Sequence, residues 1–275
     1  MDPLLALGVL VERGDDEIEL GRAALVLATL EYPGLDVDHY LRVLDDLAHQ
    51  TAPSLAGLDE PAAIVGALAW ALHSQQGFSG NVDEYYDPRN SYLNDVLNRK
   101  VGIPISLSAI YLEVGQRLGL PLEGVGMPGH FLVRFRHPVA PVLFDPFAAG
   151  AIMSEADCTA RLAHLYGPSA RMTPSMLAPV SPRSILYRML TNLKQIYVAR
   201  EDWPRAVRTV DALLVVDPGA TREYRDRGMF RFRSGDLRRA RADFDHYLTM
   251  AAEVEDASAI RQQIGLIERL ETMRN

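Results

Sequence analysis

The sequence has little cysteine and no long apolar run. Among its 275 residues there is one cysteine, Cys158, so neither an intramolecular disulfide nor a multi-thiolate metal site can form. A bilayer-spanning helix needs about 20 consecutive apolar residues, and the run from Ala212 to Val216 is far shorter. No basic segment follows Met1, as a secretory signal would require. We therefore expect no membrane contact and a cytoplasmic location.

Charge of positive sign is also in deficit. Lys and Arg number 28 against 36 Asp and Glu, which gives a net charge of −8. Nucleic-acid backbones are bound by clustered positive charge, so general nucleic-acid binding is disfavoured. The seven histidines show no metal-ligand spacing, and no glycine-rich phosphate loop is present. The sequence thus predicts neither a metal nor a cofactor.

The N-terminal ninety residues have the pattern of amphipathic helices. Asp36 precedes an apolar stripe at helical spacing and is a suitable N-cap. We expect helices over residues 16–30, 36–48 and 61–77, followed by a polar loop up to residue 90. With 48% hydrophobic and 23% charged residues, the sequence has the composition of a globular protein.

A mixed helix and strand segment comes next. Pro104 suits the first turn of a helix, where its missing N–H costs nothing. Residues 129–135 and 142–145 are short, β-branched and aromatic, and prolines lie between them. This arrangement is typical of two strands in an antiparallel hairpin.

The last third of the sequence contains a repeat. Residues 202–206 (DWPRA) recur as 236–240 (DLRRA), 34 residues later, which is the period of tetratricopeptide (TPR) helix pairs. A proline-rich stretch before it has the composition of a linker. The predicted domains are therefore 1–172, with a helical region over 1–90 and a core over 91–172, then a linker 173–183 and a TPR-like helical domain 184–275.

His130 and Asp145 are the first candidate catalytic residues. Strand alternation places His130 and Leu132 on one face of the hairpin, and Asp145 pairs roughly opposite Leu132. A carboxylate beside an imidazole fixes its tautomer and raises its basicity. The pair would supply two members of a Cys–His–Asp triad. Two alternatives remain open: a buried, hydrogen-bonded structural pair, or no contact between the two residues.

The nucleophile is the missing member. A reactive thiol favours a helix N-terminus, but the helix before the hairpin starts at Pro104. Ser106 is a candidate nucleophile there, with Ser108 as a second choice, although a capping role suits Ser106 better. Cys158 shares an apolar helix face with Leu162, which favours a core position for it.

Several motifs together resemble those of one protein family. They are Glu31-Tyr32-Pro33, Tyr85-Tyr86-Asp87-Pro88, NSYLN at 90–94, GIPISL at 102–107, RLGLP at 117–121, PGHFLVR at 128–134 and FDP at 144–146. This set is similar to the SirB family of bacterial transglutaminase-like proteins, which carry TPR-type helices at the C-terminus. The resemblance implies an α+β, mostly helical fold. It has a papain/transglutaminase-like core with a small antiparallel sheet, and an α-helical TPR-like domain follows.

The resemblance also implies roles for individual residues. In catalytic relatives a cysteine opens the core helix, a histidine starts the next strand and an aspartate ends the strand after it. His130 and Asp145 match the last two, whereas Pro104 occupies the place of the cysteine. We therefore expect a non-catalytic protein-interaction or regulatory module of a bacterial cell. The alternative is an amide-bond hydrolase or acyltransferase that uses His130 and Asp145 with a non-cysteine nucleophile.

An arginine-rich segment is the candidate partner-binding site. Between Thr221 and Arg241 there are eight arginines and three acidic residues, a local charge of +5. Arg222, Arg225 and Met229 share one helix face and would bind a protein or peptide; an acidic partner would suit them, since arginine pairs well with carboxylates. A solvated surface with no partner explains the same charge, and nucleic acid is a third, weaker alternative. The oligomeric state cannot be predicted.

Overall fold

The computed structural model describes residues 2–12, 14–250 and 255–274. The protein forms two compact units. The first, here called the core unit, is Leu10–Met189, and the second, the repeat unit, combines Met1–Val9 with Leu190–Asn275. Helix α8 (Pro182–Ala199) contributes residues to both units. The domain limits drawn from the sequence therefore remain a prediction, and each unit is described separately below.

Helices form the beginning of the fold. They are α1 (Pro3–Val11), α2 (Leu20–Ala28), α3 (Val37–Thr51) and α4 (Pro61–Ala69). Asp36 caps α3 as predicted, because its Oδ1 accepts a hydrogen bond from the His39 N–H at 2.9 Å. The helix expected from residue 16 begins only at Leu20, since a separate 3₁₀ turn occupies Asp15–Glu17. The one expected to residue 77 becomes π-helical over Trp70–Gln75.

The core unit also contains a small sheet. Its strands are β3 (Leu122–Val125), β4 (Leu132–Phe135), β5 (Val142–Asp145), β6 (Ala151–Ile152) and β7 (Pro179–Val180), in the antiparallel order β6-β5-β4-β3-β7. The predicted hairpin of β4 and β5 is present. A parallel pair, β1 (Ser79–Gly80) with β2 (Val101–Gly102), lies apart from this sheet. Helices α5 (Leu93–Arg99) and α6 (Pro104–Arg117) complete the centre, and α6 starts at Pro104 as expected.

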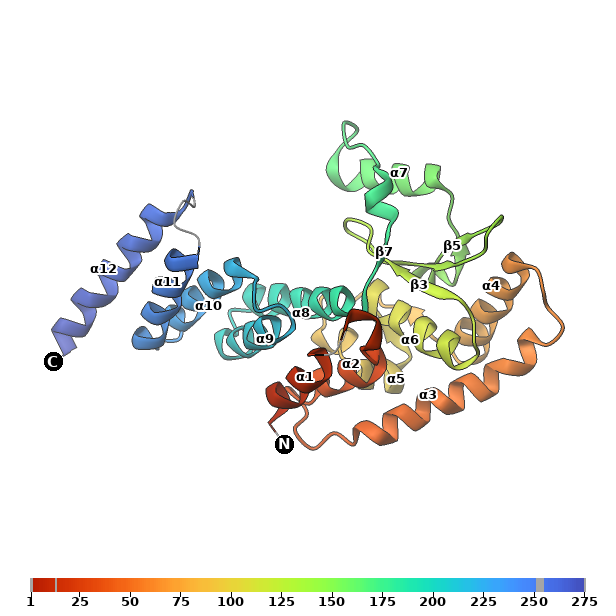
Figure 1. Cartoon of the computed structure of the whole chain (residues 1–275), viewed down its shortest axis with the longest axis horizontal. Helices are drawn as coiled ribbons and strands as arrows, with labels where there is room; N and C mark the ends of the chain where they lie inside the picture. Colours follow the sequence, from red (N-terminus) through yellow and green to blue (C-terminus); the bar gives the residue numbers. More distant parts are fainter. Residues whose placement is uncertain (1, 13, 251–254, 275) are drawn as a thin grey trace. The chain divides into compact units, whose positions relative to one another are not determined.

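The two faces of the sheet pack on different helices. Phe144 of β5 contacts Tyr111 of α6, with ring centroids 5.9 Å apart. On the other face Leu132 and Val125 form an apolar cluster with Cys158 of α7 (Glu155–Tyr166). The sheet thus lies between α6 and α7 (Figure 1). Cys158 is buried in this cluster, as the sequence predicts.

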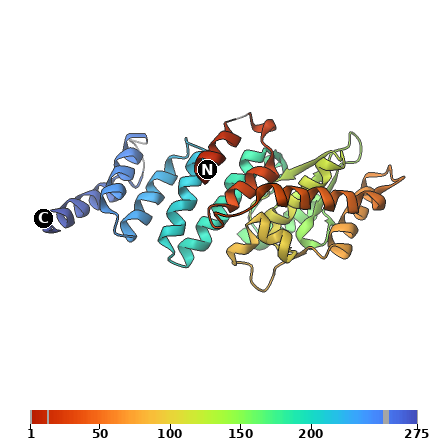
Figure 2. The same cartoon turned by 90° about the horizontal axis from the view of Figure 1, so that it is seen from below.

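Successive helices build the repeat unit. They are α9 (Trp203–Val216), α10 (Thr221–Arg233), α11 (Leu237–Met250) and α12 (Ala257–Arg274), and each lies beside the next (Figures 1 and 2). Gly228 permits the close contact of α10 with α11, because an added Cβ would lie 2.6 Å from the ring of Phe244. This small-against-large packing is the helix-hairpin arrangement that the 34-residue period predicts.

Candidate functional site

His130 is positioned by a tight turn just before β4. Gly129 has a φ of +70°, a left-handed conformation that favours glycine. The His130 N–H donates to the Met127 carbonyl at 3.1 Å. Arg188 holds the same turn from α8, since its Nη2 donates to the carbonyls of Met127 at 2.9 Å and His130 at 2.8 Å. His130 is thereby fixed just before the central strand β4, with 1% of the residue exposed.

Asp145 meets His130 from the neighbouring strand. The pairs Val133↔Phe144 and Arg134↔Leu143, continued by one step, set Asp145 opposite Leu132 as predicted. Its Oδ2 lies 2.7 Å from His130 Nε2, and both side chains are buried. The other carboxylate oxygen accepts the Phe147 N–H at 3.0 Å and so begins a 3₁₀ turn. The structure therefore brings the two residues together.

A third residue, which the sequence did not single out, completes the group. Arg161 of α7 places Nη2 2.9 Å from His130 Nδ1, and its Nη1 lies 3.8 Å from Asp145 Oδ2. A guanidinium group only donates hydrogen bonds, so Nδ1 must be the acceptor. Nε2 then carries the proton and donates it to Asp145. The three residues thus define one neutral tautomer of His130.

This arrangement leaves neither imidazole nitrogen free to act as a base. Nε2–H is directed at Asp145, and the Nδ1 lone pair accepts from Arg161. The Phe147 ring stands edge-on to the imidazole at a centroid distance of 6.2 Å. Among the residues that the structure describes, no hydroxyl or thiol hydrogen-bonds to His130. The position of a nucleophile is therefore taken by a cation.

Neither of the predicted serine nucleophiles hydrogen-bonds to His130. The Ser106 hydroxyl accepts the Ile103 N–H at 3.1 Å and donates to the Asn90 carbonyl at 2.6 Å, which is the capping role considered from the sequence. Ser108 Oγ is buried and has no hydrogen-bond partner within the described residues. Burial raises the pKa of the Cys158 thiol, and nearby Asp157 acts in the same direction, so the unreactive thiol form is favoured.

The candidate binding residues of α10 differ in their surroundings. Arg225 donates to Asp256 Oδ2 and to Asp226 Oδ1, both at 2.8 Å. Arg225 and Met229 line a hollow of about 520 Å³ together with residues of α8 and α12. Arg222 is exposed and is not part of that lining. The structure thus brings together two of the three candidates.

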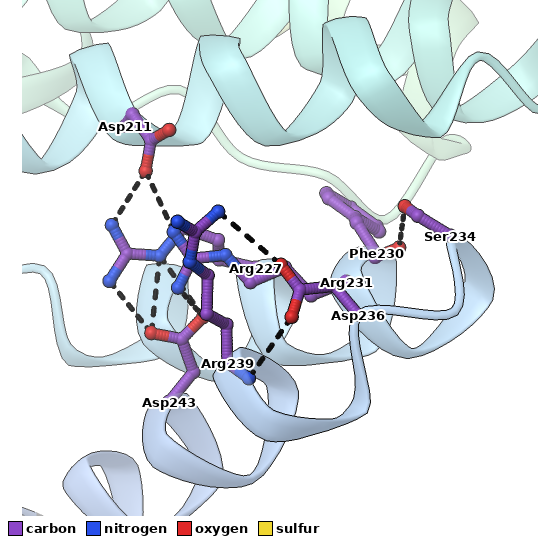
Figure 3. A network of polar contacts seen from close by, with 8 residues as sticks. All are labelled: Asp211, Arg227, Phe230, Arg231, Ser234, Asp236, Arg239 and Asp243. Carbon is purple, nitrogen blue, oxygen red and sulfur yellow. Dashed lines mark hydrogen bonds and ion pairs between the residues drawn. The ribbon is translucent and has the colours of Figure 1, made fainter.

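Most arginines of the basic segment already have acidic partners. Within the described residues, five of the eight form ion pairs with carboxylates, namely Arg225, Arg227, Arg231, Arg239 and Arg241. Figure 3 shows the central region, where Arg227 and Arg231 lie between Asp211 of α9 and Asp243 of α11. Because several of these carboxylates lie outside residues 221–241, the +5 counted along the sequence is largely compensated in space.

Membrane-spanning helices and metal-binding clusters are both absent from the described part of the protein. No helix in that part of the chain has both the length and the apolar character to cross a bilayer. No group of three or more His, Cys, Asp or Glu side chains in the described ranges is placed to hold a metal ion.

Comparisons with known proteins agree with this architecture. A model of the transglutaminase-like superfamily matches residues 38–191, and a tetratricopeptide repeat model matches residues 193–265. A UPF0162 protein of Xylella fastidiosa (strain 9a5c) is 36% identical over 263 residues, which cover 94% of each protein. Human F-box only protein 21 is 33% identical over 138 residues, 47% of this sequence and 21% of that protein.

One solved structure is also similar. A crystal structure of menin matches with a TM-score of 0.36 and 11% identity, covering 94% of this protein and 73% of the menin molecule. This likeness is too low to carry an argument about function. The sequence matches, in contrast, confirm both the expected transglutaminase-like region and the expected TPR region. The protein therefore belongs to the UPF0162 family, SirB-like bacterial members of the transglutaminase-like superfamily with TPR helices at the C-terminus.

Proposed function

We propose that this protein is a non-catalytic, transglutaminase-like module that acts through protein interaction. The observation that carries the proposal is the contact of Arg161 with His130 Nδ1 at 2.9 Å. A general base must hold a free lone pair within reach of the proton that it removes. Here the lone pair accepts from a guanidinium group, and Pro104 stands where the family's catalytic cysteine is expected.

The alternative is an amide-bond hydrolase or acyltransferase. It is supported by the buried His130–Asp145 pair, whose 2.7 Å distance suits a catalytic dyad. It requires that Arg161 leave the imidazole and that a nucleophile arrive. Ser106, the candidate nucleophile, would have to give up the hydrogen bonds that start α6. The interaction module requires neither change, so we favour it.

Catalysis is tested by comparing the full-length protein with His130→Gln. Glutamine keeps an N–H donor for Asp145, so the variant avoids an unpaired buried carboxylate. Both proteins are assayed for cleavage of fluorogenic peptide amides and esters, and for incorporation of a primary amine into a glutamine-containing protein. We expect both proteins to stay at the buffer background. Turnover by the natural protein that His130→Gln loses, at an unchanged melting temperature, would establish the enzyme instead.

The partner is a protein or peptide, and the repeat unit is the surface that we propose for it. TPR helices commonly present extended binding surfaces. Support comes from the hollow beside Arg225 and Met229, and from Arg222, whose side chain is exposed on the same helix. Arg225 is already paired with Asp226 and Asp256, so the proposal of an acidic partner rests on Arg222.

The proposed binding surface is tested by charge reversal at an exposed residue. Arg222→Glu and the matched control Arg238→Glu change the same charge on neighbouring helices, and both side chains are exposed. In capture experiments from the native host, proteins retained by the natural protein should be lost with Arg222→Glu and kept with Arg238→Glu. Acidic partners should also be released at high salt, because exposed ion pairs are screened. Equal retention by both variants would remove this surface from the proposal.

A further inference from the structure

Two guanidinium groups converge on His130 from different helices. Arg161 of α7 contacts the imidazole, and Arg188 of α8 contacts the backbone carbonyl of the same residue. Both arginines belong to the core unit. Both side chains therefore place positive charge around His130, and an anion bound there would be attracted to both. The surroundings of His130 therefore raise the question of which anion balances the two arginines.

Asp145 is the carboxylate that faces this group, and it is shared. It accepts the His130 Nε2–H and lies 3.8 Å from Arg161. Arg188 has no carboxylate partner among the described residues; it donates to two carbonyls and stands over the Phe131 ring at 5.6 Å. With a neutral imidazole, two guanidinium groups and one carboxylate give a local charge of +1. This excess stands out in a protein whose net charge is −8.

Unused hydrogen-bond donors accompany the excess charge. Both hydrogen bonds of Arg188 come from Nη2, so within the described residues its Nε and Nη1 remain donors for a ligand. Burial lowers the pKa of Arg188, because the charged form has lost hydration that these carbonyls only partly replace. The Arg161 side chain is 37% exposed, so solvent reaches it.

Two tyrosines lie near His130, and the ring of Tyr85 is 6.2 Å from that of Phe147, which stands edge-on to the imidazole. Burial raises the pKa of the Tyr85 hydroxyl, Tyr86 acts in the same sense, and the charges of Arg188 and Arg161 act against them, so Tyr85 lies in the field of both cations. The Tyr166 hydroxyl is 3.5 Å from where a Cβ on Gly129 would stand. Tyr166 is 58% exposed, so this side of the group is open to solvent.

We infer that Arg161, Arg188, Tyr85 and Tyr166 form a binding site for a single peptide carboxylate above the His130–Asp145 pair. Guanidinium groups bind carboxylates through paired N–H donors, and phenolic hydroxyls add donors at the rim. The charge count selects the ligand class. A carboxylate brings the local charge from +1 to zero, whereas a phosphate dianion leaves a negative excess beside buried Asp145.

The inference rests on the proposed non-catalytic function and gives it a ligand. In that view Arg161 occupies the place of a nucleophile. The His130–Asp145 pair then has a structural role and holds Arg161 in position. Arg161 keeps its contact with His130, while its remaining donors face the carboxylate. The peptide carboxylate comes either from the C-terminus of a partner or from a Glu or Asp side chain, and the test separates these two sources.

Three small probes test the site on the full-length protein by two-dimensional NMR titration. N-acetylglycylglycine carries a terminal carboxylate, N-acetylglutamic acid α-amide carries only a side-chain carboxylate, and N-acetylglycylglycinamide carries neither. We expect saturable shifts of the His130 amide and of arginine Nε–H signals with at least one carboxylate probe. The neutral amide should give none. The tighter of the two carboxylate probes identifies the source.

Matched variants assign the binding to these residues. Arg161→Gln and Tyr85→Phe should lower the affinity for the carboxylate probe. For Arg161→Gln we expect a loss of about tenfold, because a hydrogen bond to a charged group contributes that much to binding. Arg171→Gln is the control, since Arg171 is exposed and donates only to backbone carbonyls. Its affinity should match that of the natural protein. Arg161→Gln and Tyr85→Phe test the site even if an Arg188 variant fails to fold.

Three results would overturn the inference. They are equal binding of neutral and charged probes, absence of binding by both carboxylates, and tighter binding of inorganic phosphate, titrated as a fourth probe, than of either carboxylate. The proposed function fails separately, through His130-dependent turnover in the enzyme assay. A protein that shows neither turnover nor carboxylate binding would keep the proposed function and lose this site.

Discussion

At the scale of single residues, His130 is held by two neighbours of opposite charge. Asp145 accepts from Nε2 and Arg161 donates to Nδ1. A change of tautomer would direct the Nδ1 proton at Arg161 and the Nε2 lone pair at Asp145, so both contacts would become unfavourable together. The imidazole is therefore specified as a neutral hydrogen-bonding element, which is the property that a structural or binding role needs.

This coupling predicts the cost of removing Asp145. Asp145→Ala should lower the free energy of unfolding by about 2–3 kcal/mol, because it leaves the buried His130 Nε2–H and the half-buried Phe147 N–H without an acceptor. Asp59→Ala is the control, since Asp59 is exposed. That change should stay within about 0.5 kcal/mol. Equal effects in urea denaturation would show that the pair contributes little.

The contact between His130 and Asp145 could be predicted from the sequence because both residues belong to one hairpin. Their relation depends on strand alternation and a short turn, which are local properties of residues 129–145. Arg161 and Arg188 reach the same point from α7 and α8, far along the sequence. No periodicity marks a residue that acts across the fold, so tertiary packing alone reveals them.

At the scale of elements, local sequence patterns again predict helices and strands better than they predict contacts between distant segments. Helices with a capping residue and a full apolar stripe, such as α3 after Asp36, are predicted close to their observed limits. The two-residue strands β6 and β7, which pair with β5 and β3, are missed because two residues are too few to show an alternating pattern. The sequence pattern presents the arginines of α10 as a free basic surface, since their partners Asp211 and Asp243 lie on other helices.

The arginine network of α10 predicts a specific sensitivity of the repeat unit. Asp243 is 4% exposed and accepts from both Arg227 and Arg231 (Figure 3). Asp243→Ala should lower the free energy of unfolding by about 3 kcal/mol, because two largely buried arginines would then share Asp211 as their remaining carboxylate partner. On the same helix Asp245→Ala removes an exposed carboxylate 3.7 Å from Arg241. It should cost at most about 1 kcal/mol.

This comparison is read by chemical denaturation of the repeat unit. Trp203 of α9 stacks on Phe230 of α10 at a centroid distance of 5.9 Å, so its fluorescence reports that unit. If Asp243→Ala and Asp245→Ala shifted the unfolding transition equally, the arginine network would contribute no more to stability than an exposed ion pair.

At the scale of the whole molecule, the two units each carry a carboxyl group stabilised by arginine. In the core unit burial acts to raise the pKa of Asp87, but the bonds from Arg89 outweigh it and hold that pKa below 3.8. In the repeat unit Asp202 behaves in the same way through Arg205. The protein has two tryptophans, and they are divided between the units, with Trp70 in the core unit and Trp203 in the repeat unit.

These pKa shifts predict how stability depends on pH. A carboxyl whose pKa is lower in the folded state than in the unfolded state is protonated first in the unfolded protein. Its contribution is therefore complete above the ordinary value of 3.8 and is lost as pH falls through the lower folded value. Urea transitions should be nearly constant from pH 7 to about 5 and should weaken progressively below that.

The two tryptophans allow this loss to be assigned to each unit. Trp70→Phe leaves Trp203 as the reporter of the repeat unit, and Trp203→Phe leaves Trp70 for the core unit. Adding Asp202→Asn should reduce the loss of stability at acid pH that Trp203 reports, and should leave the loss that Trp70 reports unchanged. Asp87→Asn should reduce the loss that Trp70 reports and leave that of Trp203 unchanged. If either variant changed both reporters equally, the units would unfold as one cooperative body, and acid stability would belong to the molecule as a whole rather than to each carboxyl–arginine pair.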